Sequence, residues 1–229
     1  MKVEIVDDPA DPRVAPFREA RDGQLRRRAG LFLAEGRLVV RRLLEASRFR
    51  ARSLLLTPRA LDDLRDLLAG DDAPPAYLAS AETIRAVVGF KFHRGCLAAA
   101  ARGAPLRPEA LIEPPGARTL LALEELADPD NVGAVFRNAA AFQAAGVLLS
   151  PGCADPLYRK AIRVGMGATL SIPFARTDWR GGLERLRAAG YTLVALTPDR
   201  DAEDISAVEG RGPLPRRLAL LVGAEGPGL

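Results

Sequence analysis

The sequence has few of the residues that build metal sites and disulfide frameworks. Its 229 residues include one histidine and two cysteines, Cys96 and Cys153. These are too few for a zinc site made of thiolates and imidazoles, and they do not form the pattern of a disulfide scaffold. We therefore expect reduced thiols and no bound metal.

Long hydrophobic runs are also missing. No apolar run approaches the roughly 18 to 20 residues that a membrane span requires, and the opening residues MKVEIVDDPADPR contain acids where a signal peptide would have an apolar stretch. We expect a soluble, cytoplasmic protein without a membrane partner. Hydrophobic residues make up 48% and charged residues 27% of the chain, which is typical of a globular protein with a core.

Lysine is scarce beside arginine, and the positive charge gathers at the front of the chain. The whole sequence has a net charge of +4, whereas residues 1–60 contain 14 basic and 8 acidic groups and so carry +6. The clusters Arg26-Arg27-Arg28 and Arg48–Arg52 have two interpretations. They contact a nucleic-acid backbone, for which planar guanidinium groups are well suited, or they form a solvated helix face.

The first hundred residues alternate short apolar runs with amphipathic stretches, a pattern typical of an α/β fold. We predict strands at 54–56, 76–79 and 96–101, a helix at 59–68, and a second helix at 80–88 that Ser80 caps. These form a small domain over residues 1–102. Residues 103–118 are rich in proline and glycine, which indicates a linker.

Residues 119–229 are expected to form a second domain with a mostly parallel sheet, covered by helices on both faces. Ligand-binding groups are then expected in loops at the carboxyl ends of the strands. The predicted helices span 132–145 and 178–189. The predicted strands span 119–124, 147–149, 170–174, 191–196 and 218–222.

Three loops of this second part contain candidate chemistry. The first runs into a helix and contains Asn131 and Arg137. Either Asn131 caps the helix and Arg137 faces solvent, or the two residues and the free backbone donors at the helix start form a recess for an anionic or hydroxyl-bearing group. The second, after the strand at 218–222, has three glycines in six residues, which permits close approach of a ligand to the backbone. It lacks the Gly-Lys-Ser/Thr of a phosphate-binding loop, so ATP is disfavoured. The third is Leu196-Thr197-Pro198.

Two of these loops resemble family motifs when they are taken together. The pattern Asn131-x-Gly133-x-x-x-Arg137 resembles the first motif, and Leu221-Val222-Gly223-x-Glu225-Gly226-x-Gly228-Leu229 the second motif, of the SpoU (TrmH-like) RNA ribose 2'-O-methyltransferases of the SPOUT superfamily. The segments Phe32–Gly36 and His93–Ala99 are similar to segments of that family's substrate-binding domain of the ribosomal-protein L30e type.

This resemblance implies a catalytic domain with a C-terminal trefoil knot, S-adenosylmethionine as the methyl donor, and a homodimer. It implies RNA as the substrate, with ribosomal RNA favoured over transfer RNA because a separate recognition domain comes first. The single histidine, His93, is either structural or close to RNA. The site residues expected from the resemblance and the charge clusters are Asn131, Arg137 and Glu225 for catalysis; Leu196, Thr197, Gly223, Ala224 and Gly226 for the cofactor; and Arg26, Arg27, Arg28 and Arg94 for RNA.

One departure from the family pattern leaves an alternative open. The family has a third motif after the second, and the printed sequence reaches Leu229 before it. We expect the sequence to be a fragment of a longer gene product. The alternative is a non-catalytic RNA-binding protein that retains an incomplete methyltransferase fold, and a small-molecule methyltransferase or other α/β enzyme is a third option.

Overall fold

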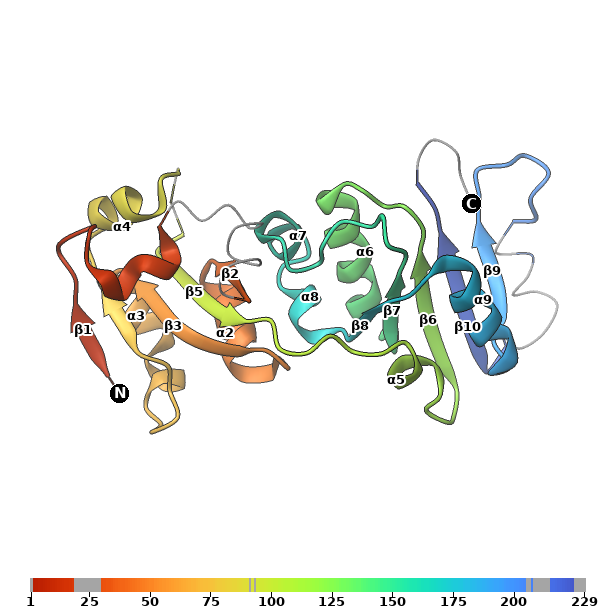
Figure 1. Cartoon of the computed structure of the whole chain (residues 1–229), viewed down its shortest axis with the longest axis horizontal. Coiled ribbons are helices and arrows are strands. Elements are labelled where there is room, and N and C mark those ends of the chain that lie inside the picture. Colours follow the sequence, from red (N-terminus) through yellow and green to blue (C-terminus); the bar gives the residue numbers. More distant parts are fainter. Residues whose placement is uncertain are drawn as a thin grey trace. The chain divides into compact units, whose positions relative to one another are not determined.

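The computed structural model describes residues 2–18, 30–90, 92, 94–204, 207 and 215–224. By their contacts these residues divide into two compact units. The first unit contains the chain up to Ala104 together with the segment Pro156–Ser171, and the second contains Pro105–Asp155 and the chain from Ile172 onward. Figure 1 labels the elements of each unit. Within the described residues, every helix is too short or too polar to cross a bilayer.

The first unit is built on a five-stranded sheet in the order β1-β4-β3-β5-β2. Strands β1, β4 and β3 are parallel, whereas β5 runs antiparallel to both β3 and β2. The predicted strands at 54–56, 76–79 and 96–101 are confirmed, and β1 and β2 are additional. The bounds are β1 (Val3–Ile5), β2 (Leu31–Glu35), β3 (Arg50–Leu56), β4 (Ala76–Leu78) and β5 (Cys96–Ala101).

Capping side chains mark the start of two α-helices of this unit. The Ser80 hydroxyl accepts a hydrogen bond from the Thr83 amide at 3.0 Å, as expected from the sequence, and Gly89 ends the same helix with a φ of 68°. Thr57 caps the helix before it. The bounds are η1 (Pro12–Phe17), α2 (Arg37–Ala46), α3 (Pro58–Leu64), η2 (Arg65–Leu68), α4 (Ala81–Val88), α7 (Arg159–Val164) and α8 (Ala168–Ser171).

The segment Pro156–Ser171 belongs to the first unit although it follows β7 in the chain. The Arg42 guanidinium donates to the Met166 carbonyl at 2.8 Å, and the Ser47 hydroxyl donates to the Leu170 carbonyl at 3.1 Å. The sequence instead predicts one domain over the whole of 119–229. The placement of Pro156–Ser171 in the first unit depends on contacts between residues more than 100 positions apart. Hydrophobic periodicity does not reveal such contacts.

The predicted strand at 170–174 is wrong. Leu170 lies in the short helix α8, and the strand β8 begins only at Phe174. Met166 and Gly167 have φ values of 50° and 84°, which turn the chain out of α7 and into α8. Leu170 is fully buried in α8, so packing within the first unit overrides the apolar run that resembled a strand.

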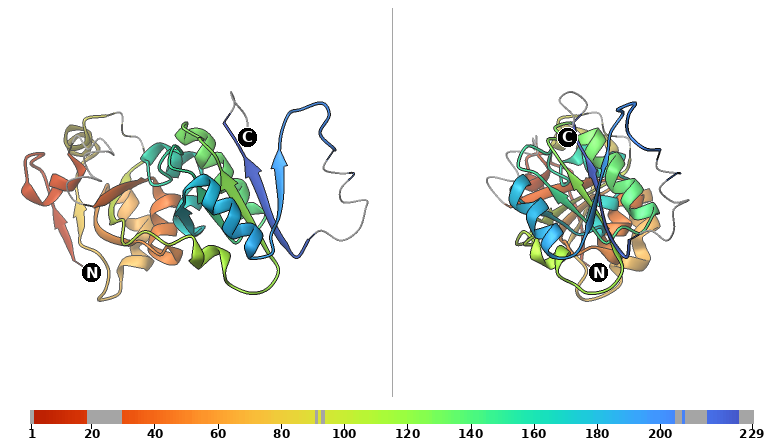
Figure 2. Two further views of the ribbon diagram at one scale, coloured as in Figure 1. Left: turned by 45° about the vertical axis from the view of Figure 1, so that its right-hand side comes forward. Right: turned by 90° about the vertical axis from the view of Figure 1, so that its right-hand side faces the viewer.

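The second unit has a sheet of five parallel strands in the order β8-β7-β6-β10-β9, which confirms the predicted parallel sheet. Figure 2 shows α6 and α9 on opposite faces of this sheet. Side chains of α5 and α9 share one apolar cluster with the strands. The bounds are α5 (Glu109–Ile112), β6 (Arg118–Leu123), α6 (Pro129–Ala141), β7 (Gly146–Leu149), β8 (Phe174–Arg176), α9 (Trp179–Ala188), β9 (Thr192–Leu196) and β10 (Arg217–Val222).

Candidate functional site

Three neighbouring strands of the second unit end at one edge of its sheet. Val222 at the end of β10 is paired with Leu123 of β6 on one side and with Leu196 of β9 on the other. The Glu124 amide, directly after β6, donates to the Val222 carbonyl at 2.9 Å. Because the strands are parallel, the loops that follow them begin side by side at this carboxyl edge (Figure 1).

Four of the residues predicted to bind cofactor come together at this edge. Leu196 ends β9 with 42% of its surface exposed, and Thr197 follows it at the surface. Gly223 and Ala224 follow the adjacent strand β10 and are half-buried. An exposed leucine beside a residue without a side chain provides an apolar surface and accessible backbone groups. Glu225 and Gly226, also predicted site residues, lie outside the described residues.

The helix α6 leaves the carboxyl edge after β6, and Asp128 caps it. An Asp128 carboxylate oxygen accepts from the Asp130 amide at 2.9 Å, and Pro129 occupies the first helical position. The helix therefore begins three residues before the predicted start at 132. The interpretation of Asn131 as the helix cap is wrong, because Asn131 lies in the first turn.

Asn131 and Arg137 lie on the same helix but at different angles around its axis. Six residues of α-helix advance about 9 Å along the axis and about 240° around it. Asn131 is half-buried near the carboxyl edge, whereas Arg137 is exposed further along the helix. Helix α6 alone therefore does not bring the two side chains together.

Two carboxylates at the end of β6 were not singled out from the sequence. Burial raises the pKa of Glu124, and the adjacent charge of Glu125 raises this pKa further. The Ser150 hydroxyl accepts from the Glu125 amide at 2.9 Å and donates to the Glu125 carboxylate at 3.3 Å. The sequence pattern that could have identified them is a pair of consecutive acids directly after an apolar strand. Such a pair is unusual there, because carboxylates are seldom buried beside a core strand.

The loop after β7 is held against the same edge by Arg176 of β8. The Arg176 guanidinium donates to the carbonyls of Ser150 at 3.0 Å and Cys153 at 2.9 Å. The Cys153 thiol donates to the Leu123 carbonyl at 3.2 Å. These bonds join the ends of β6, β7 and β8, so the loop after β7 is fixed to the strands.

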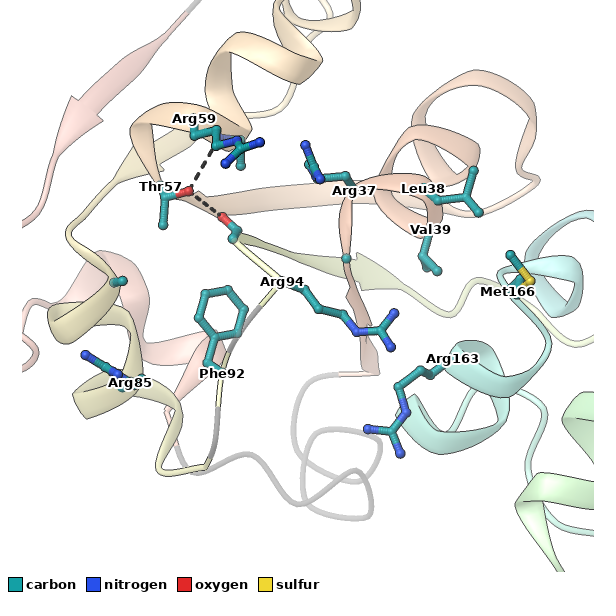
Figure 3. Close-up of a pocket in the computed structure, with 14 residues that line it drawn as sticks. Arg37, Leu38, Val39, Thr57, Arg59, Arg85, Phe92, Arg94, Arg163 and Met166 are labelled. Atoms are coloured by element: carbon teal, nitrogen blue, oxygen red, sulfur yellow. Dashed lines mark hydrogen bonds between the residues drawn. The ribbon is translucent and has the colours of Figure 1, made fainter.

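The residues predicted to bind RNA belong to the first part of the chain. Arg26, Arg27 and Arg28 lie outside the described residues, as does His93. Arg94 is exposed and lines a pocket of about 690 Å³ in the first unit, in which Arg37, Arg59, Arg85 and Arg163 also take part (Figure 3). Of these five arginines, only Arg94 is predicted from the sequence to bind RNA. Across the described part of the chain, no group of three or more His, Cys, Asp or Glu side chains is arranged to hold a metal ion.

Comparisons with known proteins identify relatives of this chain. The model of the SpoU rRNA Methylase family matches residues 118–229. An uncharacterized tRNA/rRNA methyltransferase of Mycobacterium tuberculosis is 46% identical over 238 residues, which cover 100% of this chain and 80% of the relative.

Two solved structures share the fold. The AdoMet-bound rRNA methyltransferase from Sinorhizobium meliloti has a TM-score of 0.79 at 22% identity, covering 99% of this chain and 83% of that one. The SpoU methyltransferase AviRb from Streptomyces viridochromogenes, in complex with AdoMet, has a TM-score of 0.72 at 21% identity, covering 96% and 83%. The identity along the whole chain, the match to the family model and the two sequence motifs lead to one conclusion: the chain belongs to the SpoU family of RNA methyltransferases.

Proposed function

We propose that the protein transfers a methyl group from S-adenosylmethionine to a ribose 2'-hydroxyl of RNA, with ribosomal RNA as the favoured substrate. The observation that carries the proposal is the carboxyl edge of the second sheet. There Leu196 and Thr197 lie at the end of β9, and Gly223 and Ala224 follow the adjacent parallel strand β10. Helix α6, which contains Asn131 and Arg137, begins after the next strand, β6. A homodimer in the cytoplasm is part of the same proposal.

The residues at this edge fit S-adenosylmethionine. Its adenine ring is flat and apolar on its faces, and its edge carries hydrogen-bonding groups. The exposed Leu196 side chain offers an apolar contact, and the half-buried Gly223 has no side chain to obstruct approach to the backbone. The structurally similar methyltransferases from Sinorhizobium meliloti and Streptomyces viridochromogenes were solved with AdoMet bound. When bound, this cofactor supplies an electrophilic methyl group on a sulfonium.

The protein's own task is then to position the ribose hydroxyl and to stabilise the charge that develops on it. A guanidinium carries its charge in proteins at neutral pH and is a donor only, so Arg137 is poorly suited to accept the hydroxyl proton. We assign Arg137 to the phosphate beside the target ribose and to the developing alkoxide. Arg137 is exposed and has no carboxylate partner among the described residues, so its donors are available to RNA.

A cofactor titration separates this proposal from a non-catalytic RNA-binding protein. Isothermal titration of the protein with S-adenosylmethionine should give saturable binding, which Leu196→Asp should weaken because the charge would replace an apolar contact. Leu38→Asp is a matched control, since Leu38 is exposed to a similar degree on α2 of the first unit. Absence of binding to the unaltered protein would favour the non-catalytic alternative.

Substitution of Arg137 by lysine tests its assigned role. Arg137→Lys keeps the charge but loses the planar pair of donors that fits a phosphate or an alkoxide. We expect methyl transfer to slow by about 100-fold, as for loss of one transition-state hydrogen-bond donor. S-adenosylmethionine affinity should be unchanged. Methyl transfer to RNA at saturating cofactor is the measurement, and full turnover by Arg137→Lys would show that the assignment is wrong.

A further inference from the structure

The pocket in the first unit lies where several chain segments meet. Its volume is about 690 Å³, and several of the side chains that line it are exposed to solvent (Figure 3). The junction of β2 with α2, the junction of β3 with α3, the helix α4, the residues before β5 and the helix α7 each contribute. Distant parts of the sequence therefore converge on one cavity. Its lining residues all belong to the first unit, and they are different residues from those at the carboxyl edge of the second sheet.

The charged groups of this pocket are all of one sign. Arg59, Arg85, Arg94 and Arg163 are exposed, and none forms an ion pair with another described residue. Arg37 is paired with Asp63. None of the described residues that line the pocket is a carboxylate. Four unpaired guanidinium groups around one cavity repel each other, and an anion bound among them would relieve this repulsion.

The backbone adds donors of the same kind. Helix α2 spans the ten residues Arg37–Ala46, and the cap position before it is occupied by Gly36. Glycine has no side chain to cap the helix, so the first-turn amides at the pocket wall receive no side-chain acceptor. Gly36 has a φ of 100°, and a Cβ built on it would lie 3.1 Å from Cδ of Arg94. Glycine at this position therefore allows the Arg94 side chain to lie across the start of α2.

We propose that this pocket binds consecutive phosphates of the RNA substrate through Arg85, Arg94 and Arg163. The inference rests on the proposed function, because the ligand is the RNA to be methylated. The cavity is much larger than one phosphate group, and its arginines come from α4, from the residues before β5 and from α7, which suits a chain of phosphates. Figure 3 shows Arg94 between Phe92 and the helix that contains Arg163. Phe92 is 3% exposed and forms an apolar wall.

Charge removal at the pocket tests the proposal. The pocket variant is Arg85→Gln, Arg94→Gln and Arg163→Gln in one chain. The matched control is Arg65→Gln, Arg180→Gln and Arg187→Gln, which removes the same charge from exposed positions that do not line the pocket. The measurement is the anisotropy of a fluorescent ribosomal RNA oligonucleotide, titrated with each protein at several salt concentrations, with S-adenosylmethionine affinity measured in parallel.

We expect the pocket variant to bind RNA at least tenfold more weakly, and the control less than threefold more weakly. The slope of log affinity against log salt should fall by about 2 in the pocket variant, since each lost phosphate contact on a single strand removes about 0.7. S-adenosylmethionine affinity should not change in either variant.

Three results would overturn the proposal. Equal RNA affinity of the pocket variant and the control would show that these arginines do not hold RNA. Tight binding of inorganic phosphate that only the pocket variant loses, with RNA affinity intact, would assign the pocket to a small free phosphate compound. Absence of RNA binding by the unaltered protein would also refute it. The proposed methyl transfer is judged separately, from S-adenosylmethionine binding and turnover, so the two failures are distinguishable.

Discussion

Asp11 is a carboxylate whose ionisation depends mainly on its neighbour Arg13. It caps η1, accepting a hydrogen bond from the Arg13 amide at 2.8 Å, and it pairs with the Arg13 guanidinium at 2.5 Å. These bonds lower the pKa of Asp11 from 3.8 to about 2. A carboxyl group with a lowered pKa in the folded state stabilises that state above its unfolded pKa, and this contribution is lost as the pH falls through the folded value.

The pH dependence of Asp11 can be measured directly. In an NMR titration of the Asp11 carboxyl carbon we expect a midpoint at about 2 in the unaltered protein. Arg13→Gln removes the charged partner and should return the midpoint toward 3.8. A midpoint near 3.8 in the unaltered protein would show that the pair does not persist in solution.

The roles of single residues could be predicted from the sequence where the reason is local. Ser80 and Asp178 were predicted to start helices, and both accept hydrogen bonds from amides three residues ahead. Asn131 was misjudged because Asp128 is an equally good cap, and Pro129 favours the residue before it as the cap. The pocket arginines other than Arg94 could not be recognised, because unpaired charge in one cavity is a property of the folded chain.

At the scale of the element, α4 depends on its cap. Ser80 is exposed, and its hydroxyl contacts both the amide and the hydroxyl of Thr83, at 3.0 and 2.9 Å. Ser80→Ala leaves an amide of the first turn without this acceptor, so we expect the free energy of unfolding to fall by about 1 kcal/mol. Ser80→Asp retains an acceptor and should stay within about 0.5 kcal/mol of the unaltered protein.

Urea unfolding followed by circular dichroism gives both values. The prediction concerns the difference between two substitutions at one exposed position, so loss of packing contributes little to it. Equal stabilities of Ser80→Ala and Ser80→Asp would contradict the role of the cap. A lower stability of the aspartate variant would do so as well.

Strands were predicted well where an apolar run is buried between two neighbours. The run at 218–222 became the central strand β10, paired with β6 and β9. The run at 170–174 is also largely apolar, yet its first two residues lie in α8, which packs against α2 of the first unit. Strand β1, only three residues long and largely exposed, offers too little apolar periodicity to detect.

At the scale of the whole molecule, the order of elements along the chain and their grouping in space differ. The segment Pro156–Ser171 interrupts the second part of the sequence but contributes Arg163 to the pocket of the first unit. The family resemblance identifies the order of the motifs along the chain, whereas the folded structure shows to which unit each element belongs. A variant of Arg163 should therefore alter RNA binding, although its position in the sequence lies between strands of the methyltransferase sheet.

The central claim is that the protein methylates a ribose hydroxyl of RNA. The most direct measurement is to incubate the protein with ribosomal RNA and S-adenosylmethionine that carries a labelled methyl group, digest the RNA to nucleosides, and locate the label by mass spectrometry. We expect a labelled methyl group on the ribose of one nucleoside. A label on a base, or RNA without label while the protein binds both S-adenosylmethionine and RNA, would contradict it.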